Sequence, residues 1–246
     1  MAQYFLDFPS VDYKFGNELT TNQFENIALY SDVIDQVRNY TSSYMNYNIL
    51  PDERPDQLSQ KLYGSTDYYW TFFIMNDKLR EQGWPLSNAK IHDWAIKNYN
   101  ERVITTQSVL TDKFYVGRTI QGNISSATGT ITKRNLDLGQ IWVEPSSTKF
   151  TAGETITDTL DGSKFIVALS TEDRLNAAHH YEKTDASVAG DHHDIDPTVA
   201  RPTVEAIEKT WFDRLLKQNN DLKSIIVLKQ NQLLNVVNSF KEAVSI

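Results

Sequence analysis

Residues 52–77 constrain the fold more than any other part of the chain, because they carry the signals of two short consecutive helices. Acidic residues lie just before Pro55, whose missing N–H suits the first turn of a helix, and Gly64 suits the left-handed residue that ends it. The residues that follow predict a second helix, capped by Thr66. The apolar stripe of this helix consists of Tyr69, Trp70, Phe73 and Ile74. Helices this short are not stable alone, so both must pack on another surface.

Two short apolar runs flank the helices and are predicted to form that surface. Residues 47–50 precede the first helix, residues 89–91 follow the second, and both have the composition of short strands. The order strand, helix, helix, strand resembles a LysM module. Combined with the aromatic segment 4–9, the sequence at 52–55 and the closing segment 70–77, it resembles the LysM-carrying baseplate wedge proteins of T4-type contractile-tailed bacteriophages.

The resemblance implies a structural role. Such a protein is an inner wedge component of a contractile phage tail baseplate, and it joins wedge subunits around the central hub by protein–protein contacts. The implied partners are other baseplate wedge proteins and neighbouring wedges, with a sheath-initiator-type tail protein as a further candidate. The implied location is the virion, in the tail baseplate, after assembly in the host cytoplasm.

A LysM-type peptidoglycan-binding module of a cell-wall or tail-tip protein is the alternative hypothesis. Carbohydrate-binding LysM modules usually begin with Gly-Asp-Thr, where this chain has Asp52, Glu53 and Arg54. The helix before Gly64 is also longer than usual, and the closing Ile-Pro of many such modules is absent. These differences disfavour sugar binding, although they leave the scaffold intact.

Composition and charge favour protein partners. The chain has 246 residues, 40% of them hydrophobic, which is enough for one large domain or a few small domains with real cores. Its net charge of −8 disfavours nucleic-acid binding, which depends on clustered Lys and Arg. The chain has no cysteine, which excludes disulfides and thiolate chemistry. We see no export signal and no apolar run long enough to span a bilayer, so no membrane contact is predicted.

Residues 1–46 are predicted to form an aromatic-rich N-terminal arm ahead of a LysM-like domain at residues 47–106. The arm has little regular periodicity and would fold poorly by itself. Its rings either pack on the chain's own core or anchor the arm in a neighbouring subunit, because aromatic residues dominate the energetics of interfaces. The candidate partner-binding residues of the arm are Tyr4, Phe5, Phe8 and Tyr13.

Residues 107–170 are predicted to form an inserted small antiparallel β-barrel or a curled sheet, because β-branched and polar residues alternate there between glycine turns. An internal echo supports this prediction. Residues 114–120 recur as residues 150–156, and each copy combines an apolar anchor, a glycine turn and a returning Thr-Ile strand. The insertion lacks the row of aromatic residues that stacks nucleic-acid bases.

A loop-rich bridge at residues 171–202 is predicted to lead to a helix, strand, helix segment at residues 203–246. The spacing of Ile207, Trp211 and Leu215 predicts a first helix from Glu205, and the β-branched run at 224–228 predicts a strand. That strand could complete a sheet in this chain or in a partner. The candidate partner-binding residues of this segment are Trp211, Ile225, Ile226, Val227 and Phe240.

We find no constellation of catalytic residues in the sequence. It has no P-loop, no dinucleotide-binding glycine motif and no nucleophile elbow, and carboxylate pairs such as Asp52 with Glu53 are explained by the start of a helix. His179, His180 and residues 191–194 could offer imidazole and carboxylate ligands, but their spacing is not that of a metal motif. We therefore predict no enzyme, no cofactor and no metal. The predicted fold class is α+β, with a LysM-like strand-helix-helix-strand core.

Overall fold

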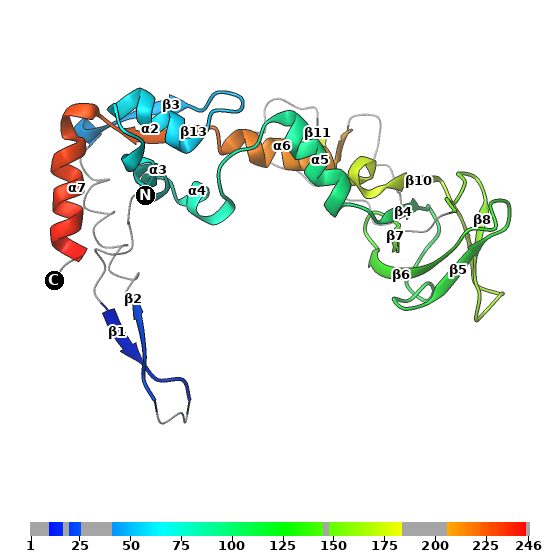
Figure 1. Cartoon of the computed structure of the whole chain (residues 1–246). Coiled ribbons are helices and arrows are strands. Elements are labelled where there is room, and N and C mark those ends of the chain that lie inside the picture. The colour runs from blue at the N-terminus through cyan, green and yellow to red at the C-terminus, as the bar shows by residue number, and fades with distance from the viewer. Residues whose placement is uncertain (1–9, 17–19, 26–40, 145–147, 184–205, 245–246) are drawn as a thin grey trace. The chain divides into compact units, whose positions relative to one another are not determined.

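The computed structural model describes residues 10–16, 20–25, 41–144, 148–183 and 206–244 (Figure 1). Helices and sheets are both present, which confirms the predicted α+β class. The chain divides into two compact units. Unit 1 contains residues 1–87 and 219–246, and unit 2 contains residues 88–218. In sequence, unit 2 therefore interrupts unit 1.

The predicted helix pair is present in unit 1, with the second helix in pieces. The first helix, α2 (Pro55–Tyr63), has Pro55 in its first turn and ends at Gly64, whose φ of 75° is left-handed. Ser65, and not Thr66, caps the next turn, because its hydroxyl accepts the Asp67 N–H at 3.2 Å. The following elements are η3 (Thr66–Tyr68), α3 (Trp70–Met75) and α4 (Asp77–Gln82).

The strand that closes this unit comes from the far end of the chain. β3 (Tyr44–Asn48), which follows η2 (Thr41–Ser43), pairs antiparallel with β13 (Ser224–Leu228). The predicted strand at residues 89–91 is wrong, because these residues begin helix α5 (Asn88–Asn98), where Ile91 and Ala95 are buried at helical spacing. The predicted strand at 224–228 is confirmed. Its β-branched residues give it a stronger strand preference than that of residues 89–91.

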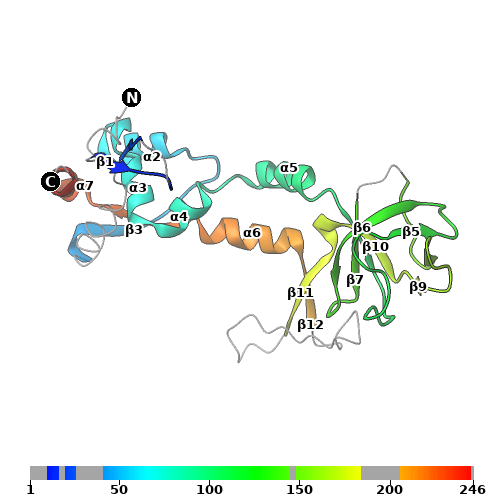
Figure 2. The same ribbon diagram turned by 90° about the horizontal axis from the view of Figure 1, so that it is seen from below.

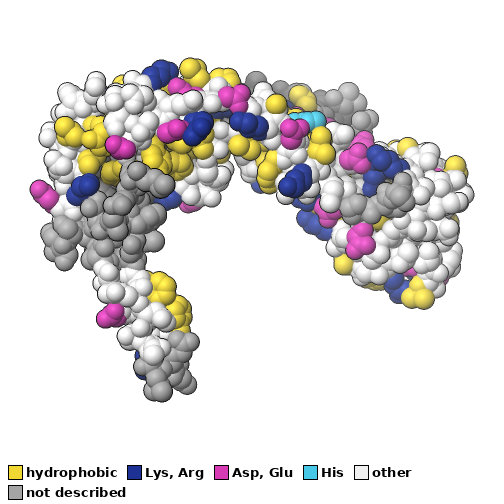
Figure 3. Space-filling view, in the orientation of Figure 1, with side chains coloured by type: hydrophobic (Ala, Val, Ile, Leu, Met, Phe, Trp, Pro, Cys, Tyr) yellow, Lys and Arg dark blue, Asp and Glu magenta, His cyan; other side chains and the backbone are white. Residues whose placement is uncertain are grey.

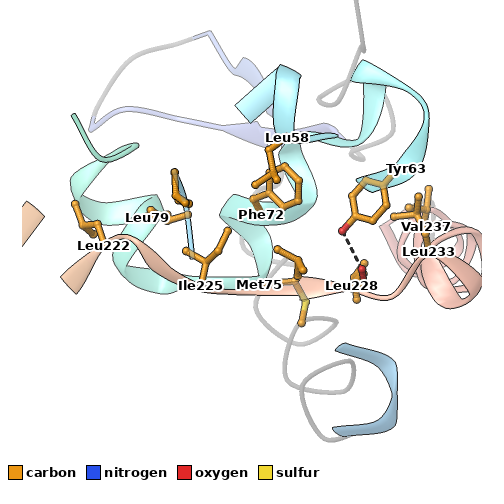
Figure 4. Packing of buried hydrophobic residues seen from close by; sticks show 12 residues of the cluster. Leu58, Tyr63, Phe72, Met75, Leu79, Leu222, Ile225, Leu228, Leu233 and Val237 are labelled. Carbon is orange, nitrogen blue, oxygen red and sulfur yellow. Dashed lines mark hydrogen bonds between the residues drawn. The ribbon is translucent and has the colours of Figure 1, made fainter. Parts of the chain in front are cut away.

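The core of unit 1 packs the helices against this two-stranded sheet (Figure 4). Its buried residues are Ile49, Leu58, Tyr63, Phe72, Met75, Leu79, Leu222, Ile225, Val227, Leu228, Leu233 and Val237. The predicted final helix is confirmed as α7 (Gln230–Val244), which supplies the last two. The Tyr63 hydroxyl donates to the Leu228 C=O at 3.1 Å, and burial raises the pKa of Tyr63 to about 12. β13 and α7 are thus integral parts of this core.

Two asparagine side chains clamp backbone segments of unit 1. Asn76, at the break between α3 and α4, accepts the Ile226 N–H and donates to the Ile226 C=O, both at 2.8 Å. It also donates to the Phe72 C=O at 2.8 Å. Asn219 accepts the Leu86 N–H at 2.8 Å and donates to the Leu86 C=O at 2.9 Å. The first clamp holds β13 to the helices, and the second joins the two segments between which unit 2 is inserted.

We expect Asn76→Ala to lower the free energy of unfolding of unit 1 by about 2–3 kcal/mol, because three hydrogen bonds are lost and a strand N–H and C=O lose their partner. Asn231→Ala, at an exposed position of α7, is the matched control and should change it by less than about 0.5 kcal/mol. Denaturant unfolding combined with amide exchange in β13 measures both effects. Equal values for the two variants would contradict the role given to Asn76.

Unit 2 contains a seven-stranded antiparallel sheet in the order β10-β4-β7-β6-β5-β8-β9. Its strands are β4 (Arg102–Thr105), β5 (Thr119–Gly122), β6 (Thr128–Asn135), β7 (Gln140–Val143), β8 (Thr155–Asp158), β9 (Phe165–Val167) and β10 (Ser170–Asp173). The described strands form no closed barrel, so the predicted barrel is wrong on that point. The edge strand β9 is short. Its Phe165 C=O accepts a hydrogen bond from Lys113 Nζ at 3.2 Å, and its Val167 C=O accepts one from Thr106 Oγ1 at 2.8 Å. These two side-chain hydrogen bonds satisfy backbone C=O groups that a further strand would otherwise bind.

The internal echo in the sequence corresponds to two copies of one local structure. The phenylalanines that open the copies are both buried, and Gly117 and Gly153 have φ values of 85° and 84°. The N–H of each glycine donates to a backbone C=O further along the chain, that of Ile131 in β6 or that of Ala168 directly after β9, at 2.8 Å. The same residue donates back to the residue after the glycine at 2.9 Å. The strands β5 and β8 that follow are antiparallel neighbours in the sheet.

Glu154, next to the glycine of the second copy, is a buried carboxylate. It accepts the backbone N–H groups of Ile124, Ser125 and Thr151 at 3.0, 2.9 and 2.6 Å, and the Ser125 hydroxyl at 2.8 Å. Burial by itself would raise the pKa of Glu154, but these bonds outweigh it and hold the pKa below its ordinary value. A Cβ at Gly122 would lie 2.4 Å from a carboxylate oxygen, so only glycine leaves room for this contact.

The rest of unit 2 contains a hairpin, helix α5 and the start of α6 (Figure 2). β11 (Ala178–Lys183) pairs antiparallel with β12 (Ala206–Thr210), and α6 (Trp211–Asp221) follows directly. The ring of His92 on α5 lies 5.4 Å from that of Phe212 on α6, so the two helices are neighbours.

Two predictions for this region need correction. The predicted loop-rich bridge contains the strands β10 and β11 in its described part, while residues 184–202 lie outside the described residues. The helix predicted from Glu205 begins only at Trp211, because Thr210 and Asp213 cap it. The Asp213 N–H donates to Thr210 Oγ1 at 3.1 Å, and the Thr210 N–H donates to Asp213 Oδ2 at 2.9 Å. The residues before this cap are therefore free to pair with β11 as a strand.

Candidate interaction surfaces

The hairpin near the N-terminus has one apolar face and one polar face. β1 (Ser10–Tyr13) pairs antiparallel with β2 (Asn22–Glu25), with Val11 opposite Phe24. Because side chains alternate along a strand, Val11, Tyr13 and Phe24 share one face. The other face carries Ser10, Asp12, Gln23 and Glu25. The hairpin is therefore amphipathic.

Aromatic rings cover the apolar face without entering a core. The ring centroid of Phe15 lies 4.9 Å from that of Tyr13 and 5.7 Å from that of Phe24, both edge to face. The exposed fractions are 42% for Val11, 55% for Tyr13, 49% for Phe15 and 48% for Phe24. Hydrophobic side chains gather along one side of this hairpin in Figure 3. None of the four residues belongs to the core of unit 1.

Only one of the predicted partner-binding residues of the arm can be placed on this face. Tyr13 lies on it, whereas Tyr4, Phe5 and Phe8 lie outside the described residues. Phe15 and Phe24 are among the aromatic residues of the predicted arm but not among its predicted partner-binding residues, and Val11 belongs to neither group. The spacing of Val11, Tyr13 and Phe15 at every second position was the signal that could have found this face, because it is the period of a strand.

The predicted partner-binding residues of β13 lie in the core of unit 1. Ile225 and Val227 are buried, and Ile226 is partly buried. One edge of β13 pairs with β3, and the Ile226 backbone on the other edge is bonded to Asn76. Phe240 lies in α7, and its side chain is outside the described part of the structure. A partner contact through β13 stays a prediction, which the burial of its side chains does not favour.

Trp211 lies in an aromatic and cationic cluster of unit 2. Its ring centroid is 5.1 Å from that of Trp142 and 6.0 Å from that of Tyr99. The guanidinium of Arg174 lies 4.3–4.7 Å from the centres of these three rings, and its Nη1 pairs with Glu101 Oε2 at 2.8 Å. This cluster ties β7, η4 (Arg174–Asn176) and α6 together. Contact of Trp211 with a partner stays a prediction, since its own chain already covers part of the ring.

The histidines predicted as weak metal candidates are only partly described. His179 and His180 lie on β11 with their Nδ1 atoms 2.9 Å apart, whereas residues 191–194 lie outside the described residues. Within the described ranges, no three His, Cys, Asp or Glu side chains are grouped so that they could hold a metal ion. In the same part of the chain, no helix has the length and apolar character needed to cross a bilayer.

Unit 2 also has an open pocket of about 390 Å³ beside the hairpin β11–β12. Its lining consists of Thr105, Gln107, Leu169, Ser170, Glu172, Ala178, Tyr181 and Glu208. The Tyr181 hydroxyl donates to Glu208 Oε2 at 3.4 Å. This acidic lining contains neither His nor Cys, and it does not indicate nucleophilic or metal chemistry.

A group of neighbouring exposed apolar side chains, such as the face of this hairpin, is typical of surfaces that contact other proteins. Residues 10–117 match a family model described as Base plate wedge protein 53. The matched range contains the hairpin, β3 and the helices α2, α3 and α4 of unit 1, and the first part of unit 2, whereas β13 and α7 of unit 1 lie outside it. No curated protein matches the chain. The family match supports a phage baseplate wedge protein, with a structural role in the virion tail and contacts to other baseplate proteins.

Proposed function

We propose that this chain is an inner wedge protein of a T4-type contractile tail and that it joins wedge subunits around the central hub by protein–protein contacts. Its partners are other baseplate wedge proteins and neighbouring wedges, with a sheath-initiator-type tail protein as a further candidate. It acts by adhesion and catalyses no reaction. The observation that carries the proposal is the family match over residues 10–117, which includes the exposed apolar hairpin.

We further propose that unit 1 is a LysM-like block that serves as the rigid part of this adhesive protein. The order β3, α2, then α3 with α4, then β13 supports this proposal, because it repeats the strand, helix, helix, strand order of a LysM module. Unit 2 would then be an insertion between the second helix and the second strand. The two hydrogen bonds between the Asn219 side chain and the Leu86 backbone support this arrangement. They join the end of the first segment of unit 1 to the start of its second segment, on either side of the insertion.

An assembly experiment tests the proposed function. The purified chain is mixed with the purified other wedge proteins of the same phage, and complexes are followed by size-exclusion chromatography and electron microscopy. We expect the chain to co-elute with a wedge complex and wedges to join into rings only when it is present. Rings that form with the same yield in its absence would reject the proposal.

The strand, helix, helix, strand order also fits the second candidate function, a peptidoglycan-binding module. Sedimentation of the chain with purified sacculi separates the two candidates. We expect the chain to stay in the supernatant, because residues 52–54 replace the usual opening motif of the sugar-binding modules. Saturable binding to sacculi, together with no binding to wedge proteins, would favour the second candidate.

A further inference from the structure

We infer that the apolar face of the hairpin β1–β2 docks into an apolar groove, rimmed by Lys and Arg, on another protein of the baseplate wedge. The inference rests on the proposed function and adds the surface used and the chemistry of its partner. The docking face consists of Val11, Tyr13, Phe15 and Phe24.

The first argument is the exposure of this face. A two-stranded hairpin is at best marginally stable alone in water, and here four neighbouring apolar side chains remain 42–55% exposed. The edge-to-face contacts of Phe15 with Tyr13 and Phe24 hold the three rings together before any partner arrives. Such a preordered group loses little side-chain freedom on binding, which favours affinity. The face has the properties of the centre of an interface.

The second argument is that unit 1 does not need this face for its own core. All buried residues of that core lie between Ile49 and Val237, on the helices, on β13 and in the adjoining segments. The hairpin contributes none of them. Among the described residues, the core of unit 1 therefore leaves this apolar face uncovered, and we assign its burial to another molecule.

The third argument is charge, which identifies the kind of molecule. The described residues of the hairpin carry Asp12 and Glu25 against Lys14. The sequence of residues 1–25 adds Asp7 and Glu18, which lie outside the described residues, so the segment has a net charge of −3. A second copy of this chain would bring the same negative charge to the contact, and an anionic lipid surface would also repel the segment. A groove with an apolar floor and basic residues around it satisfies both the rings and the carboxylates.

Photo-crosslinking tests where the face docks. A photo-crosslinking amino acid replaces Phe15 in the full chain, which is then bound to a wedge assembled from the other purified wedge proteins. We expect crosslinks to apolar residues of one wedge protein with Lys or Arg close by, and none from the control position Leu160, which is 76% exposed on unit 2. Crosslinks that map mainly to this chain itself, to a second copy or to a groove without basic residues would overturn the inference.

Affinity measurements give the matching energetic test. We expect Phe15→Ala combined with Phe24→Ala to weaken binding to the same wedge roughly thirtyfold or more, because central aromatic residues of interfaces are worth ~2 kcal/mol or more. Leu160→Ala removes an apolar side chain that is even more exposed and lies outside the hairpin, and it should leave the affinity unchanged. Circular dichroism checks that all variants keep their fold, which should hold because none of these residues is buried.

Salt dependence separates this inference from the proposed function. We expect the wild-type affinity to fall severalfold between low and physiological salt, and Asp12→Lys to reduce both the affinity and the salt dependence. An affinity for the wedge that changes neither with salt nor in the phenylalanine variants would overturn the inference but not the proposed function. A chain that binds no wedge protein at all would overturn both.

Discussion

A chain that ends at Asp221 is expected to lose the fold of unit 1 and to keep that of unit 2. Half of the buried core of unit 1, six of twelve residues, lies beyond this point: Leu222, Ile225, Val227, Leu228, Leu233 and Val237. Burial of each such side chain stabilises by about 1.5–3 kcal/mol, so the loss is about 9–18 kcal/mol. That equals or exceeds the whole stability of a typical domain, about 5–15 kcal/mol. β3 also loses the strand that pairs with it.

Amide exchange measured by mass spectrometry checks this expectation element by element. Helices α2 and α3 should exchange at the rate of an unfolded chain, whereas the strands of the seven-stranded sheet should stay protected. A chain that ends at Glu242 is the control, because it keeps every buried residue of the core. Slow exchange in α2 of the chain ending at Asp221 would show that unit 1 does not depend on β13 and α7.

The same dependence explains which parts of unit 1 could be predicted from the sequence. The helix pair is specified locally by Pro55, by Gly64 and by the apolar stripe, so the first helix was found with its correct ends. The strand 224–228 was also recognised by its own residues. Its pairing with β3 was not predicted, because strand composition says nothing about a partner so far along the chain. Residues 89–91 were nearer in sequence, yet their buried positions repeat with the helical period.

The prediction of interaction surfaces from the sequence is limited in the same way, because contacts between distant segments are not visible in it. The sequence leaves open whether the strand 224–228 completes a sheet in this chain or in a partner. In the structure β13 pairs with β3, and Asn76, far away in sequence, bonds the Ile226 backbone on its other edge. Trp211 is a predicted partner-binding residue, and the structure surrounds it with Trp142, Tyr99 and Arg174. Exposure depends on tertiary contacts, which a list of residue types does not contain. The hairpin face was within reach of sequence analysis, because its alternation is local.

The internal echo in unit 2 can be predicted from the sequence, but the meaning of one difference between its copies, a difference in charge, is visible only in the structure. The residue after the glycine is Arg118 in the first copy and Glu154 in the second. Arg118 is partly exposed, whereas the Glu154 side chain is buried and bonded to the turn at Ser125 and to Thr151. The same position therefore holds a partly exposed cation in the first copy and a buried, hydrogen-bonded carboxylate in the second.

We expect Glu154→Gln to lower the free energy of unfolding of unit 2 by about 2–4 kcal/mol at neutral pH. The substitution replaces a carboxylate that accepts several charge-assisted hydrogen bonds by an amide, whose NH₂ group then faces hydrogen-bond donors. Asp137→Asn, which neutralises an exposed carboxylate between β6 and β7, is the matched control and should change it by less than about 0.5 kcal/mol. Amide exchange in β5 and β8 reports the stability of this unit within the full chain.

The pH dependence of the free energy of unfolding of wild type and Glu154→Gln shows whether the charge of Glu154 or only its packing stabilises the turn. The pKa of Glu154 is lowered in the folded chain, so its contribution is fully present above the carboxyl pKa of the unfolded chain and is lost as the pH falls through the lowered value. The stability difference between wild type and Glu154→Gln should therefore be constant near neutral pH and shrink in acid. A difference that stays the same down to the acid unfolding of the sheet would mean that the shape of the side chain, and not its charge, holds the turn in place.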